Sequence, residues 1–427
     1  MQTLSISRSR IRPEIGKRKK KDLFEQFIPI LGMVGSNFFY VMASIFGFEY
    51  TGIENSRSYL IYVVLVLVAN FVLFSKSFTV GKGRISSKEF LMFLILSVVF
   101  LSYITPSLFT GRVNATATTF FMYFVAFSLP AIFAAIYTSK FRALFKIAKL
   151  LEIVMLLLTT SIIIKVIIPY FQGQRLLTFA GAVYHQTGSY LAAFAFGLNL
   201  YFLFEGWHHE RFSLFKSLFY KYFCYLLLII QVIGFVLPGG RGGVVLGAAY
   251  FIYIILSQIT RKNLRTLAKV VIFVVFFAAV IILSWPSLMQ NDVFRIGYMR
   301  ATQFIAPGGG INWEGTSGRN VLYLNTIHLI EQRPVLGYGL YGMWDVINYY
   351  PHNLFLEVLL QGGIVYLIIF SWILLLFIRK LLRMTKTDGR YRILQILLLY
   401  PFVMLMFSGT YLNTPQFWFV LVFVLTS

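Results

Sequence analysis

The sequence has 427 residues, of which 58% are hydrophobic and only 12% are charged. Soluble domains are roughly half apolar and about a quarter charged, so this composition excludes a soluble globular protein. In lipid, only helices and closed barrels satisfy their backbone hydrogen bonds, and the alternating pattern of barrel strands is absent. The sequence therefore predicts an all-α fold, a polytopic transmembrane helical bundle.

Apolar runs close to the ~20-residue length of a membrane-spanning helix recur along the chain and predict about twelve spans. Their expected limits are 28–48, 58–75, 89–107, 117–138, 150–169, 188–206, 222–238, 242–258, 270–289, 353–378, 393–408 and 416–427. The chain then divides into a basic cytoplasmic N-terminus (1–27), spans one to nine (28–289), a large external loop (290–352) and the last three spans (353–427).

The net charge of +23 would suit a nucleic-acid-binding protein, but the positions of the charges exclude that partner. Of the 38 Lys and Arg residues, 29 fall in the N-terminal segment and in every second predicted loop. Basic residues concentrate in this way in cytoplasmic loops. The pattern predicts a cytoplasmic N-terminus and needs only membrane lipids as the partner of these charges.

The basic residues outside those loops are Lys165 and eight arginines. The arginines are Arg57, Arg112, Arg175, Arg241, Arg295, Arg300, Arg319 and Arg333. Arginine keeps its charge and grips phosphate with a planar, bidentate fork. The predicted outer face therefore favours a phosphate-bearing ligand. For Arg57 and Arg112, in short loops, contact with lipid headgroups is the simpler interpretation.

A glycine-rich run, Gly-Gly-Arg-Gly-Gly, surrounds Arg241 at the outer junction of two spans. Gly240 and Gly242 would let the backbone approach a ligand closely, and the helix that starts here would offer free N–H groups to an anion. The alternative is a tight turn between two helices, which explains the glycines but not the arginine.

The external loop contains a predicted amphipathic helix from Arg319 to Gln332, with Ser317 as its expected N-cap and Pro334 as its stop. At about 100° per residue, Arg319 and Tyr323 share one face of this helix and His328 lies on the opposite face. If Arg319 points into a binding site, His328 points away from it.

His352 and Asn353 precede the next span, which contains Glu357. A helix N-terminus disfavours a charged imidazole, and the neutral form is the one that a general base needs. An ionisable residue within a span, such as Glu357, is a functional candidate. These residues predict a catalytic pair, His352 and Glu357; for His352, a polar cap at the interface is the alternative.

Arg175 is a weaker candidate, since it would either bind ligand or order its own loop. Motifs for metals and for serine hydrolases are missing: there is no D-x-D pair outside, no zinc spacing and no G-x-S-x-G. The expected site is metal-free and needs no cofactor.

Together these motifs resemble the O-antigen polymerase and ligase superfamily, membrane glycosyltransferases that use polyprenyl-diphosphate-linked sugars. The resemblance covers roughly residues 170–365 and rests on the order of Arg175 with Gly181, the glycine-rich run, Ser317-Gly318-Arg319, Arg333-Pro334, Gly337-x-Gly339, His352-Asn353 and Gly362-Gly363. It implies that Arg175, Arg241 and Arg319 hold the donor diphosphate and that His352 acts on the acceptor. It also implies a bacterial-type cytoplasmic membrane.

The expected function is a polysaccharide repeat-unit polymerase that transfers a glycan from a polyprenyl-diphosphate donor to a sugar hydroxyl, with inversion. A ligase that transfers a finished glycan to a lipid or protein is the first alternative, and a flippase for lipid-linked oligosaccharides is the second. The donor and a glycan acceptor are the expected partners, and polysaccharide-assembly proteins are further candidates.

Overall fold

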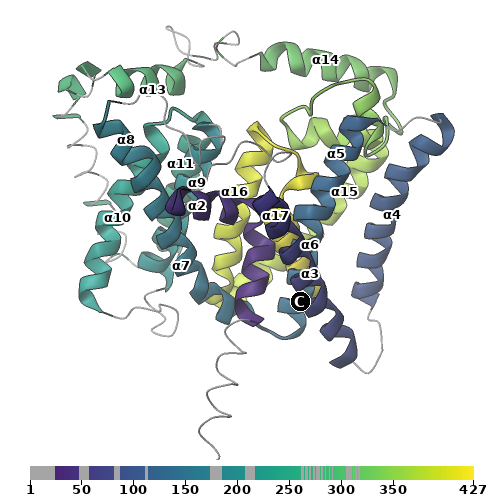
Figure 1. Ribbon diagram of the computed structural model, residues 1–427, viewed down its shortest axis with the longest axis horizontal. Coiled ribbons are helices and arrows are strands. Elements are labelled where there is room, and N and C mark those ends of the chain that lie inside the picture. Colours follow the sequence, from purple (N-terminus) through teal and green to yellow (C-terminus); the bar gives the residue numbers. More distant parts are fainter. Residues whose placement is uncertain are drawn as a thin grey trace, which may run out of the picture.

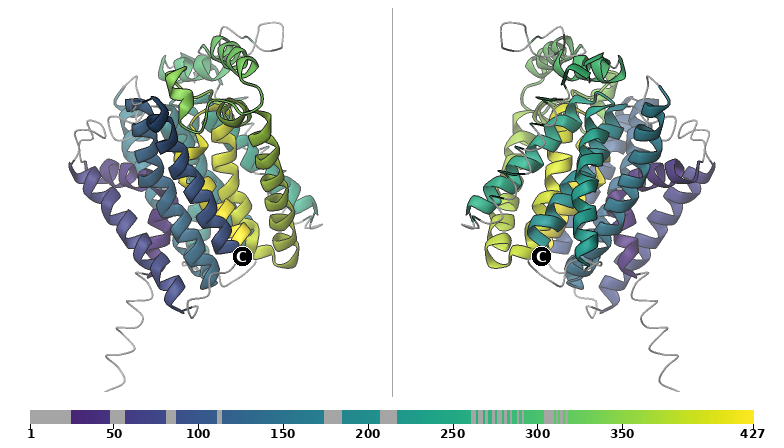
Figure 2. Two further views of the ribbon diagram at one scale, coloured as in Figure 1. Left: turned by 90° about the vertical axis from the view of Figure 1, so that its right-hand side faces the viewer. Right: turned by 90° about the vertical axis from the view of Figure 1, so that its left-hand side faces the viewer.

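A computed structural model describes most of the chain. The described residues are 25–47, 57–80, 87–110, 114–173, 185–206, 217–260, scattered positions between 264 and 290, 292–303, 310, 312, 315 and 318–427. Within them the chain forms helices and turns and no β-strand. Steep helices make a bundle, and α13 (Asp292–Thr302) and α14 (Arg319–Gln332) lie across one end of it (Figures 1 and 2). The predicted all-α bundle is confirmed.

The remaining elements run through the bundle in chain order. In the first part they are α3 (Arg57–Val80), α4 (Ser87–Thr110), α5 (Ala115–Tyr123), η2 (Phe124–Ser128), α6 (Leu129–Lys140), α7 (Leu144–Ile162), η3 (Ile163–Ile167), α8 (Ile168–Phe171), α9 (His185–Leu200) and η4 (Tyr201–Gly206). In the second part they are α10 (Leu218–Val236), α11 (Arg241–Thr260), η6 (Gly342–Asp345), α15 (Leu354–Thr387), η7 (Gly389–Tyr391), α16 (Arg392–Phe407), η8 (Tyr411–Asn413) and α17 (Pro415–Thr426).

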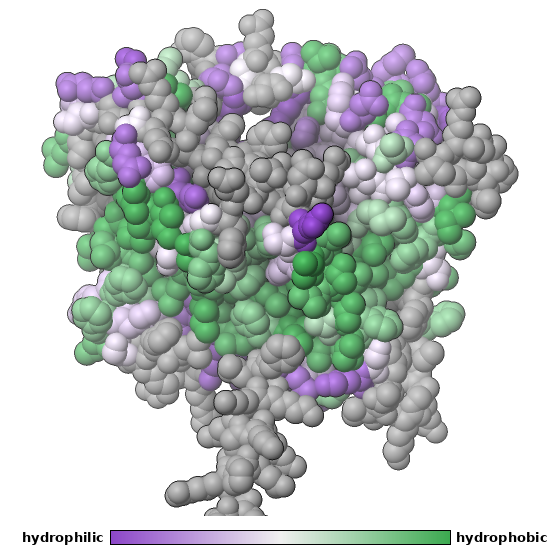
Figure 3. Space-filling view, viewed as in Figure 1, coloured by the Kyte–Doolittle hydropathy of each residue, from purple (hydrophilic) through white to green (hydrophobic). Residues whose placement is uncertain are grey.

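Eight helices in the described part of the chain are long and apolar enough to cross a membrane, or nine if one bent pair forms a single span. About twelve were predicted. The predicted span 270–289 falls on positions that are described only in part, and 416–427 is the short helix α17. The span predicted at 89–107 lies within α4. On the face seen in Figure 3, hydrophobic residues cover the middle of the molecule and hydrophilic residues lie above and below them.

The first predicted span, 28–48, is not one straight helix. Glu25–Val34 and α2 (Ser36–Phe46) meet at an angle of 97°. Gly35 lies between them with φ 59°, a left-handed conformation that glycine adopts without a steric cost. Tyr62 Oη donates to the Gly35 carbonyl over 2.8 Å, which satisfies a backbone group freed by the bend. Hydropathy detects the apolar run but not the change in its direction.

The two ends of the bundle separate the segments that the sequence assigned to opposite sides. At one end, Lys380 Nζ donates to the Ser427 carbonyl over 3.0 Å, and Arg390 lies over the ring of Phe145. At the other end, Asn114 Nδ2 donates to Asp345 Oδ1 over 2.9 Å. Predicted cytoplasmic segments therefore meet at the lower end in Figure 1, and predicted external segments meet near α14.

Candidate active site

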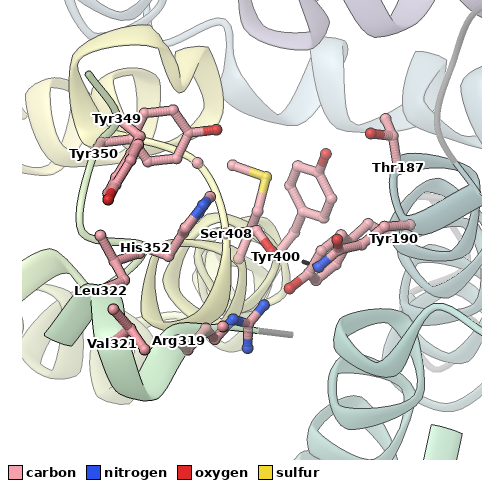
Figure 4. Close-up of a pocket in the computed structure, with 14 residues that line it drawn as sticks. Thr187, Tyr190, Arg319, Val321, Leu322, Tyr349, Tyr350, His352, Tyr400 and Ser408 are labelled. Carbon is pink, nitrogen blue, oxygen red and sulfur yellow. Dashed lines mark hydrogen bonds between the residues drawn. The ribbon is translucent and has the colours of Figure 1, made fainter. Parts of the chain in front are cut away.

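A cavity of about 630 Å³ opens beneath α14 at the end of the bundle assigned to the outside. Its walls come from α9, α14, the segment before α15, α16 and the turn after α16. The lining residues are Gln186, Thr187, Tyr190, Gly318, Arg319, Val321, Leu322, Tyr349, Tyr350, His352, Tyr400, Met404, Ser408 and Gly409. Segments up to about half the chain apart thus converge on one space (Figure 4).

Arg319 is the first residue of α14, and its guanidinium points into this cavity (Figure 4). The N-cap is Gly318, with φ 78°, so the predicted cap at Ser317 is wrong, and Ser317 itself lies outside the described residues. Arg319 is half-buried, and its side chain makes no hydrogen bond or ion pair within the described part of the chain. A half-buried cation with no acidic partner among the described residues is suited to bind an anionic ligand.

His352 faces the same cavity near Arg319 (Figure 4). Its ring packs edge-on against Tyr350, with 4.5 Å between centroids, and its Nδ1 atom is buried without a hydrogen bond in the described structure. Burial and, second, the positive charge of Arg319 lower the pKa of His352 to about 4. The imidazole is therefore neutral at pH 7. The sequence attributed such a shift to a helix dipole, whereas burial and a neighbouring charge cause it here.

Asn353 fixes the start of α15 directly after His352. It is the N-cap of α15, and its Oδ1 accepts hydrogen bonds from Phe355 N at 3.0 Å and Leu356 N at 3.2 Å. His352 has φ 54°, a left-handed backbone conformation that is uncommon for a residue with a side chain. The start of α15 thus directs His352 toward the cavity, although Asn353 does not line it.

Glu357 does not reach the cavity. It is fully buried on α15, where its Oε1 accepts hydrogen bonds from Thr410 Oγ1 and, over 3.2 Å, from Gln361 Nε2. Tyr411 Oη donates to Gln361 Oε1 and extends the network. The carboxyl group therefore ties α15 to the turn Ser408–Thr410, one wall of the site. Its position fits a positioning residue better than a group that touches substrate.

Arg241 begins α11 beside the site, but it is not among the residues that line the cavity. Its Nη1 donates to the Gly315 carbonyl over 2.6 Å, and its charge and that of Arg319 repel each other. No acidic side chain is among the residues that line the cavity. The charge of Arg241 thus acts on Arg319 at the edge of the cavity.

The glycines around Arg241 pack against a helix. A Cβ atom on Gly240 would lie 2.4 Å from Ser189 Cβ, and one on Gly242 would lie 1.9 Å from Tyr190 Oη. These residues let α11 approach α9 closely, and Tyr190 lines the cavity. The expected role of Gly240 and Gly242, close approach to a ligand, is replaced by close approach to α9.

The two remaining predicted site residues are Arg175 and Tyr323. Arg175 lies outside the described residues. Tyr323 is half-buried on α14, near enough to Arg319 to interact with its charge, but it does not line the cavity. Helical periodicity placed Tyr323 on the face of Arg319, whereas Val321 and Leu322 take the adjoining positions in the wall.

A break in α15 ties the external loop to the bundle. Gly362 (φ −138°) and Gly363 (φ 59°) leave the helical conformation, and the segment Pro334–Gly339 fills the gap. Its backbone donates to the carbonyls of Leu360 (3.0 Å) and Gln361 (2.6 Å). Ile364 N and Val365 N in turn donate to Pro334 O (2.8 Å) and Val335 O (3.3 Å). Arg333-Pro334, Gly337-x-Gly339 and Gly362-Gly363 are thus parts of one joint that fixes α14 above the cavity.

We expect Gly363→Ala to destabilise the protein strongly. A side chain at this positive φ costs roughly 1–2 kcal/mol, and the new Cβ would lie 2.3 Å from the Val335 carbonyl. The thermal midpoint of purified protein measures the effect. Gly342→Ala is the matched control, because it has no positive φ and no atom within 4 Å of its Cβ position. Equal midpoints for the two variants would contradict this account of the joint.

The sequence missed several residues of the wall. Tyr190 and Tyr400 lie within apolar spans, where the sequence does not distinguish an aromatic residue that lines a cavity from one that packs in the core. Ser408 and Gly409 gave a usable signal, since a polar Ser-Gly-Thr sequence ends an apolar run. Gln186 Nε2 donates to Ser408 Oγ over 2.6 Å and closes the cavity between α9 and α16.

One comparison with known proteins found a family to which part of the chain is similar. Residues 226–371 match the family model described as O-Antigen ligase. This match supports the O-antigen polymerase and ligase superfamily. The comparison with curated proteins gave no match.

The O-antigen ligase match covers about a third of the chain and confirms the predicted superfamily. Arg241, Arg319 and His352 lie inside the matched region, whereas Tyr190, Tyr400 and Ser408 lie outside it. The family supports a glycosyltransferase-like enzyme of the O-antigen ligase or polymerase type, acting on lipid-linked glycans in a membrane.

Proposed function

We propose that this protein is a glycan polymerase that joins lipid-linked repeat units on the outer face of a bacterial-type cytoplasmic membrane. The observation that carries the proposal is one cavity in which Arg319, with no partner among the described residues, lies near a neutral His352. A cation for a diphosphate and a base for a hydroxyl are the two groups that such a transfer needs.

The donor in this proposal is a glycan joined through its anomeric carbon to a polyprenyl diphosphate. Arg319 binds the diphosphate, and Arg241 adds positive potential from the start of α11. When the anomeric C–O bond breaks, the bond's electron pair stays on the diphosphate. Fixed cations stabilise that growing charge because they need no reorganisation during the reaction. The arginines do this without a metal ion in the proposed mechanism.

The acceptor is a sugar hydroxyl at the non-reducing end of a second lipid-linked glycan. Its oxygen attacks the anomeric carbon from the side opposite the diphosphate, so the new glycosidic bond has inverted configuration. The hydroxyl proton passes to His352, which becomes an imidazolium. A positioned base of this kind contributes about 10²–10⁴-fold to a rate.

Donor binding also tunes the base. Arg319 is one of the two causes that lower the pKa of His352. A bound diphosphate would compensate the charge of Arg319 and raise the pKa of His352 again. His352 would then become a stronger base only when the donor is in place, which limits unproductive proton transfer in the empty site.

The product pattern tests the polymerase. Purified protein supplied with a single lipid-linked repeat unit should give a ladder of products that differ by one repeat unit each. A ligase is the second candidate, favoured by the family description O-Antigen ligase. A ligase would leave the repeat unit unextended and transfer it once to an added lipid or protein acceptor. Movement of the lipid-linked unit from one leaflet of a vesicle membrane to the other, without a new glycosidic bond, would instead indicate a flippase.

Reporter fusions should show which side of the membrane holds the site. The loop charges predict that fusions after Lys146 and Lys386 are cytoplasmic and that a fusion after Asn312 is external. An alkaline phosphatase and a green fluorescent reporter at each position measure this. A cytoplasmic signal at Asn312 would place the cavity in the compartment that lacks the proposed reaction.

A further inference from the structure

A second, smaller groove of about 330 Å³ lies beside the cavity, between α14 and the segment before α15. Its polar lining residues are Asn325, His328, Asn348 and Tyr349, and three aliphatic side chains complete its floor. Tyr349 also lines the larger cavity. The two spaces therefore share one aromatic wall, on the side of the cavity that holds His352.

The groove offers unused hydrogen-bonding groups. Asn325 and Asn348 are exposed, and their side chains make no hydrogen bond within the described part of the chain. Each amide has two N–H donors and one carbonyl acceptor, a combination that can serve both roles of a sugar hydroxyl. Tyr349, 45% exposed, presents an apolar ring with a polar tip.

The groove differs from the proposed diphosphate site because its lining has no charged residue. It has no arginine, lysine, aspartate or glutamate in its lining. His328 is its one titratable group apart from Tyr349, and this residue lies at the exposed rim beside Gln332, with 3.1 Å between Nε2 atoms. A lining of amides, one aromatic ring and aliphatic groups suits an uncharged glycan and does not suit a phosphate.

We propose that this groove binds a sugar residue of the acceptor glycan, beyond the sugar whose hydroxyl reacts. The inference rests on the proposed transfer, in which His352 takes the acceptor's proton. Because Tyr349 joins the groove to the His352 side of the cavity, a chain that places its end at His352 would pass over Tyr349 into the groove. The enzyme would then recognise a longer acceptor better than a single sugar.

Glycan binding without turnover tests this directly. The probe is the free glycan released by mild acid from lipid-linked repeat units of the source cells, which carries no lipid and no diphosphate. Binding to purified protein is measured by saturation-transfer NMR. Asn325→Ala and Asn348→Ala should each weaken binding roughly fivefold, the effect of losing one hydrogen bond, and the double variant should weaken it by more than tenfold. Arg295→Ala, an exposed site on α13, is the control.

Further variants separate the groove from the reaction. His352→Asn should bind the free glycan as the parent does, because the groove does not need the base. In turnover, the double variant should raise KM for long acceptors and leave kcat unchanged. Parent-like binding by the double variant would overturn the groove proposal even if the parent polymerises. Glycan binding by a parent that performs no transfer would overturn the polymerase and leave the groove as a glycan site.

Discussion

Arg319→Lys should lose on the order of 10²–10³-fold in transfer rate, the effect typical of removing one transition-state donor. Lysine keeps the positive charge, but it cannot reproduce the bidentate fork that a diphosphate oxygen pair accepts. Arg319 has no other partner in the described structure, so its guanidinium is available for the ligand. Single-turnover transfer from a saturating lipid-linked donor measures the loss.

The control for this prediction is Arg57→Lys, at the start of α3. Arg57 is exposed and does not line the cavity, so the exchange should leave the rate unchanged. Thermal midpoints of both variants should equal that of the parent. If Arg319→Lys and Arg57→Lys transfer equally fast, the guanidinium of Arg319 has no special role in the reaction.

His352→Asn should reduce transfer by about 10²–10⁴-fold, the range for loss of a general base. Asparagine is the informative replacement because it tolerates the left-handed conformation at this position, φ 54°, better than alanine does. The variant should fold and bind donor as the parent does while it fails to take the proton. Full activity in this variant would assign the base to another group.

The pH dependence of the parent follows from the same residue. The neutral imidazole is active, and the pKa of His352 is lowered to about 4. The profile of kcat/KM, which reports the free enzyme, should therefore be flat from neutral pH downward and fall only as the pH approaches 4. The profile of kcat should fall at a higher pH, because bound diphosphate raises the pKa. A kcat/KM profile that already falls near 6.5 would contradict the lowered pKa.

The all-α bundle could be predicted from the sequence, and so could Arg319 and His352 as residues to examine, because these signals are local. Apolar length defines a span, and the difference in hydration between lipid and water forces it to be helical. Arg319 and His352 were identified because a charged or polar side chain near a membrane costs free energy and therefore suggests a function. The residues beside them, such as Gly318 and Asn353, are also typical of helix starts.

The wall of the site could not be predicted, because it depends on distant segments. Tyr190, Tyr400 and Ser408 share the cavity with Arg319 only when α9, α14 and α16 pack together. The 97° bend at Gly35 is likewise held by Tyr62 from another helix.

The roles of Gly242 and Glu357 were also decided by packing. A glycine beside an arginine predicts a ligand contact as well as it predicts a helix contact, and only the position of Tyr190 distinguishes the two. A carboxyl group inside a span predicts a function, but its hydrogen bonds to Thr410 and Gln361 turn Glu357 toward the wall and away from the cavity. Hydropathy and residue spacing report only on neighbours in the sequence. The direction of a buried side chain depends on the hydrogen-bond partners that the tertiary structure brings to it.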